Sequence, residues 1–243
     1  MNNNNLIIVT LIILTGILIT YIIFLKFDYY KKTAQYRLNP LEESTIHISS
    51  EAMKDALWII GDSRAKSWDT SFLHFLPYKK VNLAIGGQST KQVLERFKND
   101  LEITHPKLIL LQVGINDLKS IGFLRDPYIT QNCISNTIKI LDICKEHHID
   151  AIYTSIFPVG DIEILRRPLW KNNVYDSIKK VNHALKEYCK KNNVHFFDAY
   201  TMLLSETHPP TTTKTFQKDF LHLNETGYQF LTKKLEEEYS LYK

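Results

Sequence analysis

The chain begins with a long, unbroken run of hydrophobic positions. From Leu6 to Leu25 no residue is charged, and fifteen of these twenty residues are Leu, Ile, Val or Phe. A helix rises about 1.5 Å per residue, so this run is long enough to cross the roughly 30 Å hydrocarbon core of a bilayer. Its apolar residues occupy every side of a helix, whereas a helix packed on a soluble domain keeps a polar face. The pattern predicts a transmembrane helix at residues 6–25, within an N-terminal segment 1–25.

The flanks of this run favour an uncleaved anchor over a cleaved signal peptide. The leader Asn2–Asn5 contains no lysine or arginine. The run is followed by Lys26–Tyr30, which offers bulky residues where a signal peptidase needs small ones. We therefore expect the helix to remain part of the protein, with a cleaved signal as the competing interpretation.

Basic residues after the run bear on its orientation. Lys26, Lys31, Lys32 and Arg37 all lie on its C-terminal side. The positive-inside rule then places the rest of the chain on the cytoplasmic side of the membrane. Four charges do not exclude the opposite orientation, in which the domain would be exported. The polar residues 26–54 are interpreted as a tether.

From residue 55 to 243, short apolar runs alternate with longer segments of helical periodicity. Five runs are candidate strands: Ala56–Ile60, Val81–Ile85, Leu108–Val113, Ala151–Ile156 and Val194–Phe197. The helical segments lie at about 65–75, 89–104, 128–148, 171–192 and 224–241. Such alternation is typical of a parallel sheet covered by helices on both faces. We predict one α/β domain at 55–243 with a central parallel sheet of about five strands.

Polar and glycine residues follow the predicted strands. In open parallel sheets, ligands bind beyond the carboxyl ends of the strands. Ser63 follows the first candidate strand, Gly86-Gly87 the second, Gly114–Asp117 the third and the loop Pro158–Trp170 the fourth. These segments are expected to converge on one rim of the sheet.

Three side chains supply the groups of a nucleophilic serine mechanism. Ser63 lies where a buried strand turns into a helix, and Asp219 and His222 stand three residues apart. In such a mechanism the base activates the hydroxyl and the acid orients the base. The oxyanion donors would be the backbone N–H groups of Ser63 and Gly87 and the side-chain amide of Asn116. Each motif alone could be an ordinary turn or cap, but their joint placement at strand ends favours catalysis.

Composition argues against several other classes of protein. A net charge of +4 over 243 residues does not indicate a nucleic-acid-binding protein. Cys133, Cys144 and Cys189 are odd in number and lack Cys-x-x-Cys spacing, so they signal neither a disulfide framework nor a zinc site. We expect them to be buried small apolar residues. No metal site and no cofactor are expected.

The four motifs resemble those of the SGNH (GDSL-type) hydrolase family. In the family's order they are Gly61-Asp62-Ser63, Asn82–Gly87, Gly114–Asp117 and Asp219–His222. The resemblance implies a three-layer α/β/α sandwich of flavodoxin-like topology. It also implies a catalytic set that consists of Ser63, Gly87, Asn116, Asp219 and His222. Similar chains act as lysophospholipases, thioesterases or esterases that remove acetyl groups from sugars.

Two residues depart from the family pattern. Arg64 follows the nucleophile where the family often has an aliphatic residue, and Ser67 replaces a glycine commonly found four residues after that serine. Neither is expected to touch the catalytic set. Both alter the first helix of the pocket and weaken any inference about substrate.

Two further segments are candidates for the substrate pocket. Arg166 and Arg167 lie in the loop after the fourth strand, and guanidinium groups suit a phosphate or a carboxylate. The alternative for them is a solvated loop, or a salt bridge to Asp161 or Glu163. The segment Ile121–Leu124 either lines an acyl pocket or packs the loop after Asn116.

These observations predict a membrane-anchored serine ester hydrolase of esterase or lipase type, with an acyl-enzyme on Ser63. The expected substrate is a small-molecule, lipid or glycan ester; its chain length and the oligomeric state are not predicted. An O-acyltransferase with the same triad is the alternative. A non-catalytic binding module on the same fold is less favoured, because no nucleophile, base or oxyanion donor is missing.

Overall fold

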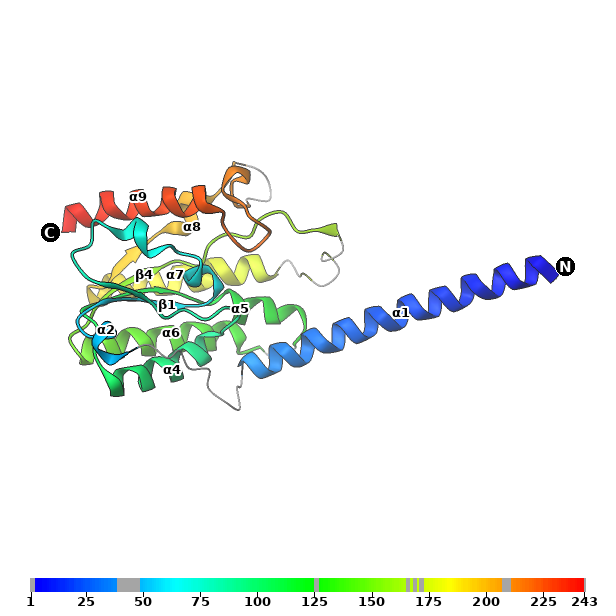
Figure 1. Ribbon diagram of the computed structural model, residues 1–243, viewed down its shortest axis with the longest axis horizontal. Coiled ribbons are helices and arrows are strands. Elements are labelled where there is room, and N and C mark those ends of the chain that lie inside the picture. Colours follow the sequence, from blue (N-terminus) through cyan, green and yellow to red (C-terminus); the bar gives the residue numbers. More distant parts are fainter. Residues whose placement is uncertain are drawn as a thin grey trace.

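A five-stranded parallel sheet forms the centre of the domain (Figure 1). The computed structural model describes residues 3–38, 49–124, 127–164, 167, 170, 173–206 and 211–242. The strands are β1 (Leu57–Gly61), β2 (Lys80–Asn82), β3 (Leu108–Gln112), β4 (Asp150–Thr154) and β5 (His195–Phe197). They lie in the order β2-β1-β3-β4-β5, and every neighbouring pair is parallel. This is the flavodoxin-like order, so the predicted α/β fold is confirmed.

Apolar sequence accounts for the burial of the central strands. All five residues of β1 are buried, as are all five of β3. Successive side chains of a strand point to opposite faces, so Trp58 and Ile60 enter the core on one face, and Leu57 and Ile59 enter the core on the other. A strand with no polar alternation can be accommodated only where both faces are covered.

Helices cover both faces of the sheet. One face carries α4 (Thr90–Ile103), α6 (Ile129–Glu146) and α7 (Asn173–Asn192). The other carries α3 (Ser63–Lys66), the 3-10 helix η1 (Thr70–Leu73), α8 (Ala199–Leu203) and α9 (Glu225–Tyr242). Shorter elements connect them: α2 (Ser50–Met53), α5 (Ile115–Leu118) and the 3-10 helices η2 (Lys119–Gly122) and η4 (Lys214–Phe216). The three cysteines lie buried within these layers, as predicted.

The single helix predicted at 65–75 is wrong, because the chain forms α3 and η1 there instead. Ser67 ends α3, and the carboxylate of Asp69 accepts a hydrogen bond from the backbone N–H of Ser71 at 2.8 Å, which starts η1. Between the two elements Trp68 is buried, and its indole N–H donates to the hydroxyl of Thr232 at 2.9 Å. Local capping and one buried side chain therefore override the helical periodicity.

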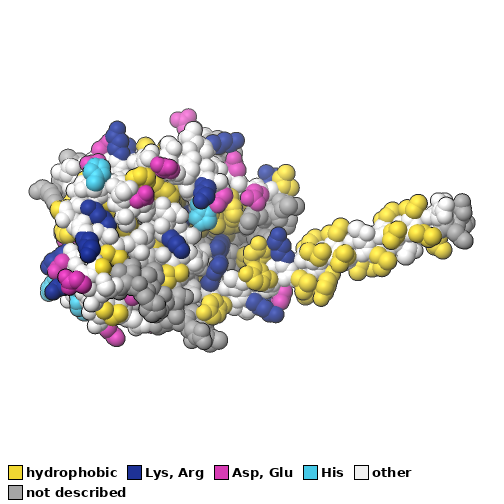
Figure 2. Space-filling view, viewed as in Figure 1, with side chains coloured by type: hydrophobic (Ala, Val, Ile, Leu, Met, Phe, Trp, Pro, Cys, Tyr) yellow, Lys and Arg dark blue, Asp and Glu magenta, His cyan; other side chains and the backbone are white. Residues whose placement is uncertain are grey.

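Helix α1 (Asn3–Leu38) projects from the domain at its N-terminal end and packs on it at its C-terminal end (Figure 1). It is long and apolar enough to cross a membrane, and its projecting part exposes apolar side chains (Figure 2). Residues 26–38, interpreted above as the start of a tether, instead continue the helix and contact α4, α5 and η2. Residues 39–48 of that stretch lie outside the described residues.

Candidate active site

Ser63 lies directly beyond the carboxyl end of β1, as the first residue of α3. The turn that leads to it is tight, because a Cβ at Gly61 would lie 1.8 Å from the carbonyl oxygen of Gln112 on β3. Only glycine fits there. Asp62 then caps α3, since its carboxylate accepts a hydrogen bond from the backbone N–H of Arg64 at 2.9 Å. These contacts fix the backbone that carries the Ser63 hydroxyl.

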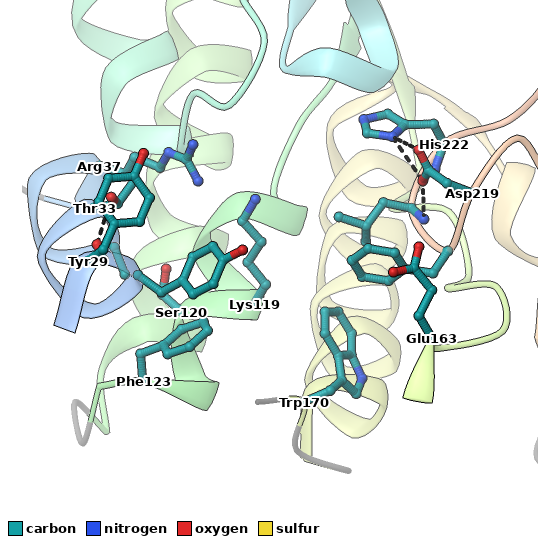
Figure 3. Close-up of a pocket in the computed structure, with 14 residues that line it drawn as sticks. Tyr29, Thr33, Arg37, Lys119, Ser120, Phe123, Glu163, Trp170, Asp219 and His222 are labelled. Carbon is teal, nitrogen blue, oxygen red and sulfur yellow. Dashed lines mark hydrogen bonds and ion pairs between the residues drawn. The ribbon is translucent and has the colours of Figure 1, made fainter. Parts of the chain in front are cut away.

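A chain of hydrogen bonds joins Ser63, His222 and Asp219. The hydroxyl oxygen of Ser63 lies 2.8 Å from Nε2 of His222. On the other side of the imidazole, Nδ1 lies 2.8 Å from Oδ2 of Asp219 (Figure 3). The structure therefore brings Ser63 to the pair Asp219 and His222, although His222 lies 159 positions further along the chain.

Hydrogen bonds hold Asp219 in its carboxylate form. Burial raises the pKa of Asp219, but hydrogen bonds from the backbone N–H of Leu221 at 2.8 Å, from the imidazole of His222 and from the backbone N–H of His222 at 2.9 Å outweigh burial, so the pKa lies below its ordinary value. A carboxylate at this position accepts the Nδ1–H of the imidazole, which leaves Nε2 to accept the Ser63 proton. The arrangement can activate a serine as a nucleophile.

The buried Arg64 joins the two halves of this site. Arg64 is 0% exposed, and its Nε donates to the carbonyl of Leu221 at 2.7 Å. Its Nη1 donates to the carbonyl of Phe157 at 3.0 Å, and the guanidinium lies over the Phe157 ring. Burial lowers the pKa of Arg64 to about 10, so the group keeps its charge near neutral pH. Because Leu221 precedes His222, Arg64 connects the turn that carries Ser63 to the loop that carries His222. From the sequence, Arg64 was not expected to contact the catalytic set.

Gly87 and Asn116 lie at the same rim as Ser63. A Cβ at Gly86 would lie 3.7 Å from the Cβ of Ser63, and Asn116 donates its amide to the carbonyl of Gln88 at 2.9 Å. Gly87 has a φ of 84°, a left-handed conformation that favours glycine. Asn116 is buried, and an amide nitrogen carries two N–H groups, so the second can serve a substrate oxyanion.

Buried polar contacts with α4 brace the loops that carry these donors. Arg96 donates through Nε to the side-chain oxygen of Gln88 at 3.3 Å and pairs with Asp100 at 3.1 Å. Asp117 accepts hydrogen bonds from the N–H and the hydroxyl of Thr90, at 2.9 and 2.6 Å. Burial raises the pKa of Asp117 to about 7, although these hydrogen bonds act in the opposite direction. The segments beyond β2 and β3 are thus both held on the start of α4.

A pocket of about 340 Å³ opens beside His222 (Figure 3). Its walls come from the last turns of α1, from the α5–η2 segment, and from the loops after β4 and before α9. The lining residues are Tyr29, Tyr30, Thr33, Ala34, Arg37, Lys119, Ser120, Phe123, Glu163, Trp170, Asp219, Phe220, Leu221 and His222. Ser63, Gly87 and Asn116 are not among these lining residues, but His222, which is, lies 2.8 Å from the Ser63 hydroxyl. The hydrophobic pattern of the sequence did not predict that α1 would line this pocket.

The cations on the pocket wall differ from those that the sequence suggested. Arg167 is exposed, donates through Nε to the carbonyl of Ile162 at 3.3 Å, and does not line the pocket, whereas Arg166 lies outside the described residues. Arg37 and Lys119 line the wall instead. Over the described ranges, His, Cys, Asp and Glu side chains nowhere gather in a group of three that could hold a metal ion.

Comparisons with known proteins find one matching family model and several similar folds. Residues 56–230 match the model of the GDSL-like lipase/acylhydrolase family. A GDSL-like lipase from Bacteroides thetaiotaomicron has a similar structure, with a TM-score of 0.63, 20% identity, and coverage of 86% of this chain and 99% of that one. Among curated proteins, no sequence matches this chain.

Two further solved structures share the fold. One, provisionally described as a platelet activating factor from Streptococcus pneumonia, has a TM-score of 0.61 and 21% identity, with coverage of 93% of this chain and 98% of that one. A catalytic mutant of an acetylxylan esterase from Geobacillus stearothermophilus has a TM-score of 0.60 and 15% identity, with coverage of 76% and 93%. At these identities the likeness concerns the fold.

Proposed function

Because the chain belongs to the GDSL-like lipase/acylhydrolase family, we propose that it is a membrane-anchored serine ester hydrolase that works through an acyl-enzyme on Ser63. The observation that carries this proposal is the pair of 2.8 Å contacts from Ser63 to His222 and from His222 to Asp219, at the edge of a pocket. Nucleophile, base and orienting acid are thereby in hydrogen-bond reach of one another.

The first half-reaction transfers the acyl group to the protein. The Oγ atom of Ser63 attacks the ester carbonyl carbon while Nε2 of His222 takes the hydroxyl proton. Negative charge then develops on the former carbonyl oxygen, which would accept hydrogen bonds from the backbone N–H groups of Ser63 and Gly87 and from the amide of Asn116. When the intermediate collapses, the bond to the alcohol oxygen breaks, and His222 returns the proton to that oxygen.

The second half-reaction releases the acid. Water takes the place of the alcohol, gives a proton to Nε2 of His222 and attacks the acyl carbon. The same donors stabilise the second oxyanion. Collapse breaks the bond to Oγ of Ser63, and His222 returns the proton to the serine. A sugar or lipid hydroxyl in place of water would give acyl transfer, so product analysis distinguishes the two outcomes.

Helix α1 is proposed as the membrane anchor. Its length and hydropathy suit a membrane span, and basic residues between Lys26 and Arg37 favour a cytoplasmic domain. Fusions of cytoplasmic and exported reporters to the C-terminus test the side of the membrane. A mature protein that lacks residues 1–25 by mass spectrometry would instead indicate a cleaved signal.

Replacement of the nucleophile tests the hydrolase proposal. We expect Ser63→Ala to remove hydrolysis of short-chain aryl esters, while Ser67→Ala, which removes an exposed hydroxyl four residues along, retains it. A series of acyl chain lengths measured on the full chain then separates acetyl esters from long-chain lipid esters. Full activity in Ser63→Ala would contradict the acyl-enzyme.

A further inference from the structure

The last turns of α1 form one wall of the pocket, although they lie outside the part of the chain that matches the family. The match begins at residue 56, whereas Tyr29, Thr33 and Arg37 line the pocket. Residues three or four positions apart lie on one face of a helix, so these three share a face. Figure 3 shows them on the side of the pocket opposite Asp219 and His222.

Specific contacts hold this wall in place. Ala34 is buried, and the ring of Tyr30 stacks on that of Phe123 with centroids 5.6 Å apart. The hydroxyl of Ser89, which caps the start of α4, donates to the backbone carbonyl of Arg37. The end of α1 is therefore attached to the loop between β2 and α4, which carries Gly87, one of the proposed oxyanion donors.

Arg37 places a guanidinium beside that loop. A Cβ added to Gly87 would lie 3.0 Å from Nη2 of Arg37. Within the part of the chain that the structure describes, this partly buried guanidinium has no hydrogen-bond or ion-pair partner. Lys119 adds a second positive charge on the same side of the pocket, and Glu163 lies on the opposite side (Figure 3). A partly desolvated cation favours an anionic ligand, and guanidinium matches a phosphate in shape.

The wall lies close to the proposed membrane surface. The apolar run ends at Leu25, and Tyr29, the first pocket residue, follows four residues later, about 6 Å along a helix. Tyrosines at this depth are typical of the boundary between membrane and water. Ester amphiphiles in a bilayer carry their charged group at that boundary, with the acyl chain below it.

We propose that the last turns of α1 recognise the substrate and that Arg37 binds a phosphate on the alcohol portion of an ester amphiphile at the membrane surface. This proposal rests on the proposed function, because it assigns the substrate class of the same site. The acyl group would lie against the aromatic wall of Tyr30, Phe123 and Trp170, and the phosphate near Arg37 and Lys119. The helix would thereby serve as both anchor and specificity element.

Binding to full-length protein in a neutral detergent tests this proposal without turnover. The Ser63→Ala protein is titrated by calorimetry with 1-butyrylglycerol 3-phosphate, with uncharged 1-butyrylglycerol, and with glycerol 3-phosphate. The same titrations are repeated with three double variants, in which the Ser63→Ala protein also carries Arg37→Gln, Arg37→Lys or Lys31→Gln. Lys31 is the matched control, because it is an exposed cation on the same helix. Thermal unfolding verifies that each variant is folded.

We expect the phosphate ester to bind about tenfold more tightly than the uncharged ester, as one charge-assisted contact provides. Arg37→Gln should abolish this advantage, whereas Lys31→Gln should keep it and Arg37→Lys should keep part of it. An equal advantage in Arg37→Gln and Lys31→Gln, or no advantage at all, would overturn the proposal. So would glycerol 3-phosphate binding as tightly as the ester, since the site would then serve a free phosphate compound. Failure of the hydrolase proposal would appear separately, as absent ester cleavage by protein that retains Ser63.

Discussion

The two walls of the pocket have different origins. One wall carries Asp219 and His222, lies within the part of the chain that matches the family, and is joined to the Ser63 turn by the buried Arg64. The other consists of the last turns of α1, outside that match, with Arg37 beside the oxyanion loop. Under the two proposals above, the first wall supplies the reaction and the second selects the ester. Changes in the first wall should slow cleavage of every ester alike, while changes in the second should alter which ester is preferred.

Loss of the base should have the largest effect. His222→Ala removes the group that accepts the Ser63 proton, and we expect kcat to fall by about 10⁴-fold or more on charged and uncharged esters alike. His74→Ala, at an exposed histidine that follows η1, should leave kcat unchanged. Steady-state kinetics on an aryl ester measure both. A loss of less than tenfold would show that another group acts as the base.

Loss of an oxyanion donor should have the next largest effect. Asn116→Ala removes an amide that donates one N–H to the carbonyl of Gln88 and whose second N–H is proposed to donate to the developing charge. We therefore expect kcat to fall by about 10²–10³-fold, or roughly 3 kcal/mol, with little change in KM. Asn132→Ala, at an exposed amide on α6, is the control. If Asn116→Ala raised KM and left kcat unchanged, the amide would contribute to binding of the substrate and not to stabilisation of the transition state.

Loss of the buried arginine should disturb the first wall indirectly. Arg64→Met leaves the carbonyls of Leu221 and Phe157 without their donor, so the melting temperature should fall, and kcat should fall by about tenfold as His222 moves from its place. Arg64→Lys should recover part of kcat. Assays well below the melting temperature of both variants distinguish a displaced His222 from loss of folded protein. An unchanged kcat in folded Arg64→Met would refute the positioning role of Arg64.

The last prediction concerns the stability of the fold and involves Asp117, for which the smallest effect on catalysis is expected. Its folded-state pKa of about 7 lies above that of an unfolded aspartate, so the folded state holds the extra proton. The protonated Asp117 therefore contributes to the free energy of unfolding at low pH, and this contribution is lost as the pH rises through 7. The loss amounts to about 2–3 kcal/mol between pH 5 and 8. Denaturant unfolding at the two pH values should show a larger loss in the wild type than in Asp117→Asn. Equal losses in both proteins would contradict the shifted pKa.

The sequence predicted the sheet well because the strands carry their signal locally. Continuous apolar runs such as Leu108–Leu111 can be buried only in a covered sheet, and the strand-end rule then predicted Ser63 and Asn116 at one rim. The helix predicted at 65–75 failed because its interruption depends on Trp68 meeting α9, a contact that periodicity does not contain.

The two missed features of the site are missed for related reasons. The partners of Arg64 are backbone carbonyls 93 and 157 residues away, which no motif can signal. The docking of α1 left a weak signal, since Phe27, Tyr30 and Ala34 recur at helical spacing within a stretch whose charges suggested a tether. Which face of that helix would be covered depended on the surface formed by α4, α5 and η2.

The central claim is that Ser63 is the nucleophile, and covalent labelling tests it most directly. The full-length protein is treated with a fluorophosphonate probe, which reacts with an activated serine, and the labelled peptide is identified by mass spectrometry. We predict a single modification on Ser63 that is lost in Ser63→Ala and strongly reduced in His222→Ala. Labelling of another serine, such as Ser120 on the pocket wall, or ester hydrolysis that continues after Ser63 is fully labelled, would contradict the account.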